Sequence, residues 1–404
     1  MSDPNLEYRC VKFGEVVRLC TERCDPSIQG IKRYVGLEHM EPGDLRIRAW
    51  GDVADGTTFT TRFRPGQVLF GKRRAYQRKV ALADFDGVCS GDIYVFESSD
   101  PARLLPALLP FVCLADAFFD RAIDTSAGSL SPRTNWSSLT EHQFALPPLE
   151  EQARFCSALS AAERAFQCAC DLTHAAAGAA DAFAATAFRG AKHRDTVNHP
   201  RLGLVAREWP VVTVGDVTEA SQYGLSIAPE ARGQYPILRM MNLVDGHVVE
   251  NDIRFVDLPD GMFSVYQLES GDVLFNRTNS IDLVGRTGVY TLEGEHVFAS
   301  YLVRLKVKRS LVNPEYLTAY LNAPLGRQQV LSYATKAVSQ ANVSASNLAK
   351  VLIPLPPRHV QDRIVTELAS MRRAQGQAKE HAQRAAEVKY SLIRRLADYP
   401  KEMQ

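Results

Sequence analysis

Cysteine is missing from the whole second half of the chain. All eight cysteines lie between Cys10 and Cys170, whereas a secreted protein stapled by disulfides would need them in both halves. The close pairs Cys20/Cys24 and Cys168/Cys170 have no second Cys or His pair at the spacing of a zinc site. We therefore expect reduced thiols and no bound metal.

Long apolar runs are absent too. The richest segment, residues 104–119, is interrupted by two prolines and Asp116 and is too short to cross a membrane. The first ten residues have no basic flank followed by an apolar stretch, as a secretory signal would have. With 46% hydrophobic and 23% charged residues, the 404-residue chain is expected to be a cytoplasmic globular protein with room for two domains.

Motifs for nucleotide binding and catalysis are missing as well. Neither G-x-G-x-x-G nor G-x-x-x-x-G-K-[ST] occurs, so no dinucleotide or P-loop site is predicted. Leu146 and Leu355 precede the Pro-Pro pairs, where a DNA amino-methyltransferase needs a hydrogen-bonding Asn, Asp or Ser. Asp84, Asp86 and Asp92 are not followed by the Glu-x-Lys of a nuclease-like metal site. The sequence therefore predicts no catalytic residue and no cofactor, and the chain is expected not to be an enzyme.

An overall excess of charge is also lacking, because the formal net charge is only +1. Locally the balance differs: seven basic residues and no acidic residue lie between Arg62 and Lys79. A local basic patch matters more for DNA binding than the total charge does. The composition leaves DNA binding open and singles out this segment.

What the chain does contain is an internal repeat. Its offset grows from 201 residues (Gly14 to Gly215) to 209 residues (Ala145 to Pro354). Five motifs recur in the same order: residues 13–17 and 213–217, 34–40 and 237–243, 65–72 and 270–277, 88–90 and 298–300, 145–152 and 354–361. One such match arises easily by chance, but five in one order indicate two similar halves.

Each half is predicted to consist of a globular lobe followed by a long helix. Runs such as Val-Leu-Phe and Ile-Tyr-Val-Phe, bounded by Gly, Asp and Pro, are typical of strands, and the first repeated motif is expected to be extended as well. Pro148 and Pro357 suit the first position of a helix. The predicted fold class is α+β, with mixed lobes at 1–146 and 202–352 and helical segments at 147–201 and 353–404. The helices themselves are expected at about 149–192 and 358–398.

Both predicted helices carry an apolar seam in which steps of four and three residues alternate. Its members are Phe155, Leu159, Ala162, Phe166, Ala169, Thr173, Ala176, Ala180, Phe183 and Ala187, and then Ile364, Leu368, Met371, Gln375, Ala378, Ala382, Ala385, Leu392 and Leu396. This spacing predicts a coiled coil. Acidic residues outnumber basic ones in the first helix and the reverse holds in the second, which favours an antiparallel pair related by a pseudo-twofold axis. Two separate amphipathic helices, each covering its own lobe, remain the alternative.

The sequence resembles the specificity subunits of Type I restriction–modification systems. The resemblance covers nearly the whole chain and rests on the duplicated order of four segments: Leu146–Gln152, Leu355–Gln361, Gly66–Lys72 and Gly271–Asn279. It departs from the family pattern at Arg358-His-Val, where the family usually has a Leu-Glu-Glu type of start.

The resemblance implies a non-catalytic subunit that reads DNA. Each lobe would be a target-recognition domain for one half of a bipartite site, and the paired helices would act as a ruler and dock two methyltransferase subunits. Restriction and translocase subunits would join through the complex. S-adenosylmethionine, ATP and Mg²⁺ would be bound by these partners only.

The first group of candidate DNA contacts follows the predicted strand at 68–70. Arginine binds guanine or phosphate, and lysine neutralises phosphate. The candidates are Lys72, Arg73, Arg74, Tyr76, Arg78 and Lys79. These positive charges have no acidic residue nearby in the sequence, so we expect the segment to bind an anion such as DNA phosphate. The alternative is a solvated loop without a binding partner.

The equivalent segment of the second lobe is rich in amides and hydroxyls, and asparagine suits adenine. The candidates there are Asn276, Arg277, Thr278, Asn279, Ser280 and Arg286. An ordinary Asn/Ser-rich turn is the alternative. Because the two loops differ, the two lobes should read different half-sites, so the full DNA target should be asymmetric.

A third segment precedes each Pro-Pro pair. Arg133 and Asn135 in the first half, and Gln340 and Asn342 in the second, are candidate DNA contacts or, equally, helix-capping and turn residues.

Two other functions of the chain remain open. One is the specificity subunit of a Type IIB-like system, in which one partner methylates and cuts. The other is a coiled-coil adaptor for proteins, with no DNA ligand.

Overall fold

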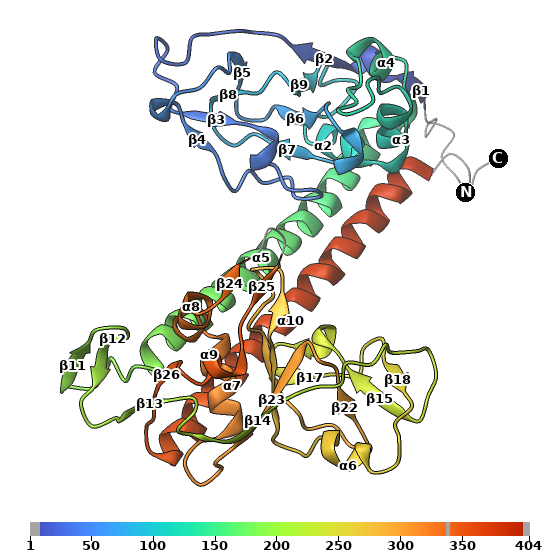
Figure 1. Ribbon diagram of the computed structural model, residues 1–404. Coiled ribbons are helices and arrows are strands. Elements are labelled where there is room, and N and C mark those ends of the chain that lie inside the picture. Colours follow the sequence, from blue (N-terminus) through green and yellow to red (C-terminus); the bar gives the residue numbers. More distant parts are fainter. Residues whose placement is uncertain (1–8, 337–339, 399–404) are drawn as a thin grey trace. The chain divides into compact units, whose positions relative to one another are not determined.

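The computed structural model describes residues 9–336 and 340–398. These residues form two compact units. Unit 1 contains the residues up to Thr173 and from Gln377 onward, and unit 2 is His174–Gly376. The long helices α5 (Leu149–Ala187) and α10 (Arg358–Asp398) therefore contribute one part to each unit. Each unit is a lobe of sheets and short helices that contacts its parts of α5 and α10 (Figure 1).

The first lobe contains the sheets β1-β10, β2-β9-β6-β7 and β4-β3-β8-β5. Its elements are β1 (Arg9–Lys12), α1 (Phe13–Val16), β2 (Val17–Cys20), β3 (Arg33–Val35), η1 (Leu37–His39), β4 (Gly51–Asp52), η2 (Val53–Asp55), β5 (Thr61–Phe63), β6 (Val68–Gly71), η3 (Ala75–Gln77), β7 (Val80–Leu82), β8 (Gly87–Cys89), β9 (Ile93–Ser98), α2 (Leu109–Leu114), α3 (Asp116–Asp124), α4 (Trp136–Thr140) and β10 (Gln143–Leu146).

The second lobe contains the sheets β11-β12, β13-β26, β14-β23-β19-β21-β17-β16, β18-β15-β22 and β20-β25-β24. Its elements are β11 (Thr196–His199), β12 (Gly203–Ala206), β13 (Val211–Thr213), β14 (Thr218–Tyr223), β15 (Tyr235–Leu238), η4 (Met240–Asn242), β16 (Leu243–Val244), β17 (His247–Val248), β18 (Arg254–Val256), α6 (Met262–Tyr266), β19 (Val273–Asn276), β20 (Thr278–Asn279), β21 (Thr287–Val289), β22 (Val297–Phe298), β23 (Leu302–Val307), α7 (Pro314–Asn322), α8 (Pro324–Ser332), β24 (Thr335–Lys336), β25 (Ala341–Asn342), α9 (Ala345–Leu348) and β26 (Leu352–Pro354).

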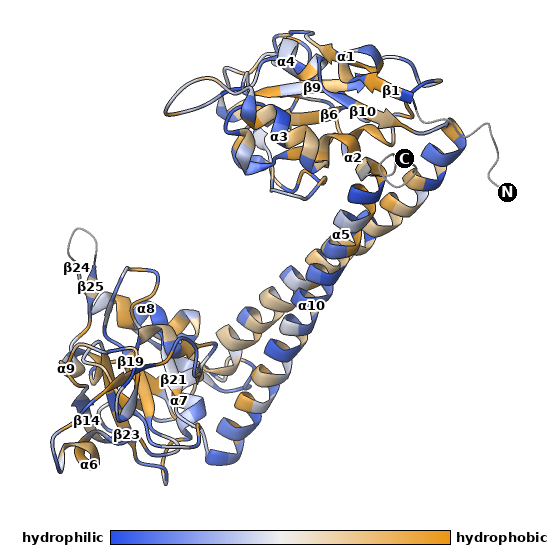
Figure 2. Ribbon diagram, turned by 90° about the vertical axis from the view of Figure 1, so that its right-hand side faces the viewer, coloured by the Kyte–Doolittle hydropathy of each residue, from blue (hydrophilic) through white to orange (hydrophobic). Residues whose placement is uncertain are grey.

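The central strands β6 and β19 show why the Val-Leu-Phe motif is repeated. Val68 and Phe70 face one hydrophobic core of the first lobe and Leu69 faces another, so β6 is buried on both sides. In β19, Val273 and Phe275 face one core and Leu274 faces another. A strand that is buried on both faces needs an unbroken apolar run rather than an alternating one. Hydrophobic residues accordingly colour these strands orange (Figure 2).

The tertiary structure repeats along with the sequence. Strand β3 runs parallel to β8, and β15 runs parallel to β22, at the second and fourth repeated motifs. Gly66 and Gly271 precede β6 and β19 with φ values of +87° and +89°, a conformation that glycine adopts without steric cost. The internal repeat predicted from the sequence is therefore a repeat of structure.

The first repeated motif is not extended as predicted. Phe13 and Val16, three residues apart, are both buried in the short helix α1. In the second lobe Val214 and Val217 occupy the same turn after β13 and are also buried. The apolar side chains of this motif are three residues apart and point to the core from a helical turn. The prediction of an extended strand over this motif is therefore wrong.

The end of the first helix also differs from the prediction. Helix α5 ends at Ala187 instead of about 192, because Gly190 adopts a left-handed conformation (φ +61°) and the Ala191 N–H bonds back to the Thr186 carbonyl at 3.1 Å. The hairpin β11–β12 then follows, and its first strand lies within the segment 147–201 that was expected to be helical.

The seam predicted for the two helices is confirmed, since none of its members is exposed to solvent. In unit 1, Leu159 of α5 shares a core with Ile393 and Leu396 of α10. In unit 2, Ala184 of α5 shares a core with residues of the first turns of α10, including Ile364. In both units an early part of one helix meets a late part of the other, so the pair is antiparallel and the alternative of two separate helices is wrong.

The repeated motif that closes each lobe ends on a buried glutamine. Gln152 is 1% exposed, and its side-chain oxygen accepts a hydrogen bond from the Leu105 N–H at 2.9 Å. Its amide nitrogen donates to the carbonyls of Arg103 and Pro147, both at 2.8 Å. One side chain thereby ties the first turn of α5 to the loop before α2.

Gln361 repeats this arrangement in the second lobe. It is 0% exposed and accepts a hydrogen bond from the Asn313 N–H at 2.8 Å. Its amide donates to the Leu311 carbonyl at 3.0 Å and to the Pro356 carbonyl at 2.8 Å. The glutamine in the motif is therefore a connector between each lobe and its own helix.

Replacing either glutamine by alanine should destabilise the unit that contains it. Gln152→Ala or Gln361→Ala leaves three backbone groups, one buried and two partly buried, without this partner, and we expect a loss of about 2–4 kcal/mol in the free energy of unfolding. Urea denaturation measures this loss. Gln377→Ala on the exposed face of α10 is the control, and an effect as small as that of the control would contradict the connecting role.

Candidate nucleic-acid interface

In the first lobe, two candidate segments that lie far apart in the sequence form one surface. Arg73 and Arg133 make an isolated antiparallel β-bridge, and the Thr134 N–H donates a hydrogen bond to the Lys72 carbonyl at 3.0 Å. The segment after β6 therefore runs alongside the segment before α4. The sequence predicts these two segments as separate sites.

Asp92 holds the two arginines of this bridge in place. Its carboxylate accepts from Arg133 Nε at 2.8 Å and from Arg73 Nη1 at 3.2 Å. Burial alone would raise the pKa of the Asp92 carboxyl, but the hydrogen bonds from Arg133 and Arg73 outweigh it and keep the pKa below its ordinary value. Asp92 thus stays ionised and fixes two guanidinium groups side by side, while Arg133 remains exposed.

Acidic residues from other parts of the first lobe neutralise much of the positive charge of the basic segment 62–79. Arg62 pairs with Asp86 at 2.7 Å, Arg64 pairs with Glu22 at 2.6 Å, and Arg78 pairs with Asp116. The Lys79 ammonium donates to the Leu37 carbonyl at 2.7 Å. The expectation of uncompensated charge is therefore wrong for most of the segment, because acids distant in the sequence fold against it.

Lys72, Arg74 and Tyr76 keep the properties of a DNA contact without an acidic partner in the described part of the chain, whereas Arg73 presents its guanidinium from the pair with Asp92. Among the described residues no carboxylate pairs with Lys72 or Arg74, and the Tyr76 side chain is 56% exposed. Arg74 and Arg78 both have a φ of +54°, which is strained for residues other than glycine and here bends the loop at both ends of η3. Such strain is typical of functional loops.

The second lobe builds the same surface from different side chains. Strand β20 pairs with β25, so that Thr278 lies opposite Asn342. The Asn342 amide donates to the Thr278 hydroxyl at 2.9 Å and accepts from Arg277 Nη2 at 3.3 Å. The Val343 N–H donates to the Arg277 carbonyl at 2.9 Å, just as Thr134 bonds to Lys72 in the first lobe. In each lobe, therefore, the two predicted segments lie side by side and form one surface.

Asn276 corrects the set of candidates. It is 0% exposed, and its amide donates to the Leu283 carbonyl at 3.1 Å inside the lobe. The prediction that it contacts DNA is wrong, because Asn276 is the last residue of the buried strand β19. An asparagine next to a strand end gives no sequence signal that it points inward.

The remaining candidates lie on or close to the surface. Arg286 and Gln340 are exposed. Asn279 donates to the sulfur of Met240 at 2.9 Å and accepts from the Ser280 N–H at 2.8 Å, as expected for a turn. Asn135 occupies the N-cap of α4 but makes no capping hydrogen bond, so its exposed amide is free to bind elsewhere.

Two tyrosines that the sequence analysis missed support the cations of the interface. The Lys72 ammonium lies 4.6 Å from the ring centroid of Tyr94, and the Arg277 guanidinium lies 4.8 Å from that of Tyr223. Both tyrosines lie on strands next to the loops, on β9 and β14. Strand neighbours are set by sheet topology, so no local sequence signal links these residues.

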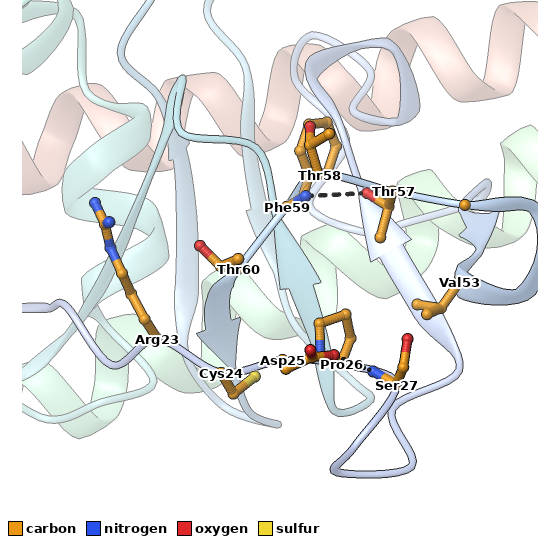
Figure 3. A pocket seen from close by; sticks show the side chains of 11 residues that line it. Arg23, Cys24, Asp25, Pro26, Ser27, Val53, Thr57, Thr58, Phe59 and Thr60 are labelled. Atoms are coloured by element: carbon orange, nitrogen blue, oxygen red, sulfur yellow. Dashed lines mark hydrogen bonds between the residues drawn. The ribbon is translucent and has the colours of Figure 1, made fainter.

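A separate hollow of about 640 Å³ lies beside the sheet β4-β3-β8-β5 of the first lobe (Figure 3). Hydroxyl side chains line much of it, including Ser27, Thr57 and Thr60, and the Phe59 N–H bonds to the Thr57 hydroxyl at 3.2 Å. None of the candidate DNA contacts lines this hollow.

Over residues 9–336 and 340–398, no three His, Cys, Asp or Glu side chains gather as metal ligands. None of the helices described is long and apolar enough to cross a membrane.

Comparison with known proteins relates the chain to DNA specificity proteins. Residues 206–386 match the model of the Type I restriction modification DNA specificity domain. The EcoKI specificity subunit of a Type I restriction enzyme from Escherichia coli K12 is 29% identical over 152 residues, covering 37% of this chain and 32% of the relative. The putative MjaX specificity subunit from Methanocaldococcus jannaschii is 26% identical over 202 residues, covering 48% and 47%. The alignments thus span a third to about half of these curated relatives.

Solved structures resemble the whole chain. The S subunit of a Type I restriction-modification system from M. genitalium has a TM-score of 0.59 at 13% identity, covering 98% of both chains. A chain solved in work on complex assembly and conformational transition of the type I R-M system has a TM-score of 0.55 at 22% identity, again covering 98% of both. At these identities the likeness concerns the fold, and it confirms the predicted fold class.

Proposed function

We propose that the chain is the non-catalytic subunit that reads a bipartite, asymmetric DNA target, since its residues 206–386 match the model of the Type I restriction modification DNA specificity domain. The observation that carries the proposal is the interface built twice, once in each lobe, from the loop after β6 or β19 and the segment before α4 or α9. One surface presents mainly cations and the other mainly amides and hydroxyls, so each lobe reads its own half-site.

The partners follow from this function. The subunit binds double-stranded DNA and directs two methyltransferase subunits to it, and restriction and translocase subunits join through the complex. These partners bind S-adenosylmethionine, ATP and Mg²⁺, and this chain binds none of them. Such an assembly works in the cytoplasm, where the cell's DNA is. Selecting DNA from a random duplex pool with the full-length protein tests the function: enrichment of two short motifs at a constant spacing supports it, and no enrichment contradicts it.

Arg73→Ala combined with Arg74→Ala should erase one half of that motif. Each good arginine–base contact contributes about 1–3 kcal/mol of discrimination, so removing both weakens the preferred half-site by at least tenfold. Competition binding against duplexes mutated in one half at a time measures this. The matched control is Arg18→Ala, whose side chain is 68% exposed and pairs with Glu97 on the opposite strand of the sheet. A double variant that discriminates as well as wild type would show that this loop is not a reader.

A further inference from the structure

The two helices of unit 1 share one buried ion pair. Lys389 of α10 is 0% exposed, and its ammonium lies 2.9 Å from the carboxylate of Glu163 on α5. The ammonium also lies 4.0 Å from the ring centroid of Phe166. In the sequence, the seam of the second helix skips from Ala385 to Leu392, and Lys389 occupies the missing seam position. Burying a charged side chain at this seam position costs desolvation free energy. Lys389 therefore needs a role other than packing in the seam.

Both charges of the pair also hold a turn of the first lobe. The Lys389 ammonium donates to the Gly43 carbonyl at 2.6 Å, and Glu163 accepts from the Leu45 N–H at 3.3 Å. The Leu45 carbonyl in turn accepts from the Leu82 N–H at 2.8 Å. Leu82 belongs to β7, the strand that follows the basic loop. The ion pair is therefore two hydrogen bonds away from the strand on which that loop ends.

A second connection reaches the same loop from α10. The Asp116 carboxylate lies between Arg78 of the loop and Arg394 of α10, with 3.8 Å to the latter. The Arg78 guanidinium also lies 4.5 Å from the ring centroid of Phe119. Hence Asp116 links the last turns of α10 to the far end of the loop that begins with Lys72.

Among its described residues, the second lobe has no equivalent of the Glu163–Lys389 pair. At the offset of 209 residues that relates the helices, Glu163 corresponds to Arg372 and Lys389 corresponds to Ala180. Arg372 donates to the Asp245 carbonyl at 3.3 Å, and Ala180 carries no charge. The ion pair is thus a feature of the first lobe alone, although one of its partners belongs to the helix that follows the second lobe.

We propose that Lys389 is a positioning residue for DNA reading by the first lobe: through Glu163 and the turn at Gly43 it fixes the loop that presents Lys72, Arg73 and Arg74. The inference rests on the proposed function, since it takes this loop to be a reader. It places a determinant of the first half-site in the C-terminal helix, far from the first lobe in the sequence.

The test uses the full-length protein and the bipartite motif that wild type selects from a random duplex pool. Two variants remove the connection: Lys389→Met, and Glu163→Gln combined with Lys389→Met, which leaves no buried charge unpaired. Arg384→Ala is the control, since its 71% exposed side chain pairs only with Glu380 on the same helix. Discrimination is measured for each half-site, and hydrogen exchange of β6 and β9 reports whether the first lobe stays folded.

We expect the double variant to lose at least about tenfold in discrimination at the half-site that Arg73→Ala with Arg74→Ala also weakens, the size of one lost base contact. The other half-site and the protection of β6 and β9 should match wild type. Equal losses at both half-sites, loss of protection in β6 and β9, or unchanged discrimination would each overturn the inference. If wild type selects no motif, the proposed function fails first and takes the inference with it.

Discussion

Exchanging residues 211–354 for the equivalent lobe of another specificity protein is expected to change one half of the recognised motif completely and leave the other half unchanged. The physical reason is that β13 pairs with β26 and closes the lobe, so that all its sheets after the hairpin β11–β12 lie inside the exchanged segment. The seam residues of α5 and α10 remain those of this chain. Gln361 hydrogen-bonds to backbone groups at the junction, and the first lobe offers the same kind of backbone groups to Gln152, so these bonds do not depend on the side chains of the exchanged lobe.

Mapping of the selected or methylated motif measures the result of the exchange. The reciprocal exchange of residues 9–146 is the matched control and should change the opposite half. A change in both halves by either exchange would refute independent reading by two lobes. An unchanged motif would show that the DNA is read outside both of them.

Breaking the Glu163–Lys389 pair is expected to have the second largest effect, this time on stability. Lys389→Ala leaves the Glu163 carboxylate buried with no countercharge, and removal of one partner from such a pair costs about 3–5 kcal/mol. Removing both charges with Glu163→Gln and Lys389→Met should cost much less, because replacing a whole buried pair by neutral groups of similar volume is often nearly neutral.

The measurement is a double-mutant cycle in urea, followed by a signal specific to unit 1 because the chain has two units. Trp209 belongs to unit 2, so a Trp209→Phe background leaves Trp50 and Trp136 of the first lobe as the fluorescent reporters. A double variant as unstable as the single variant would show that the lysine contributes through its contact with Gly43 and not through the charge pair.

Much of the architecture was predictable from local patterns. The 3.5-residue spacing predicted α10 at its observed bounds and the start of α5, since a buried seam demands apolar residues at that spacing. The repeated Val-Leu-Phe run predicted the central strands β6 and β19, because burial on both faces excludes polar side chains. The end of α5 was missed, as the left-handed turn at Gly190 is a small local event at the end of a long pattern.

The candidate site was predictable in its segments but not in its partners. The loops after β6 and β19 and the segments before α4 and α9 were each identified from residue types. The sequence indicates only that Asp92 does not complete a nuclease-like metal site, whereas in the structure it pairs with Arg73 and Arg133. Asn276 had the right residue type but points into the core.

The sequence by itself determined the duplication, the class of fold, the helix seam and the kind of side chain available for DNA, because each of these depends on residues close together in the chain or on a period. Only the tertiary structure decided which charges remain free, which segments meet and where Lys389 lies. These depend on contacts between residues far apart in sequence: Arg62 lies on β5 and pairs with Asp86, directly before the neighbouring strand β8, and Lys389 reaches Gly43 across 346 residues. An ion pair is a property of two positions in space, and no local period encodes the distance between them.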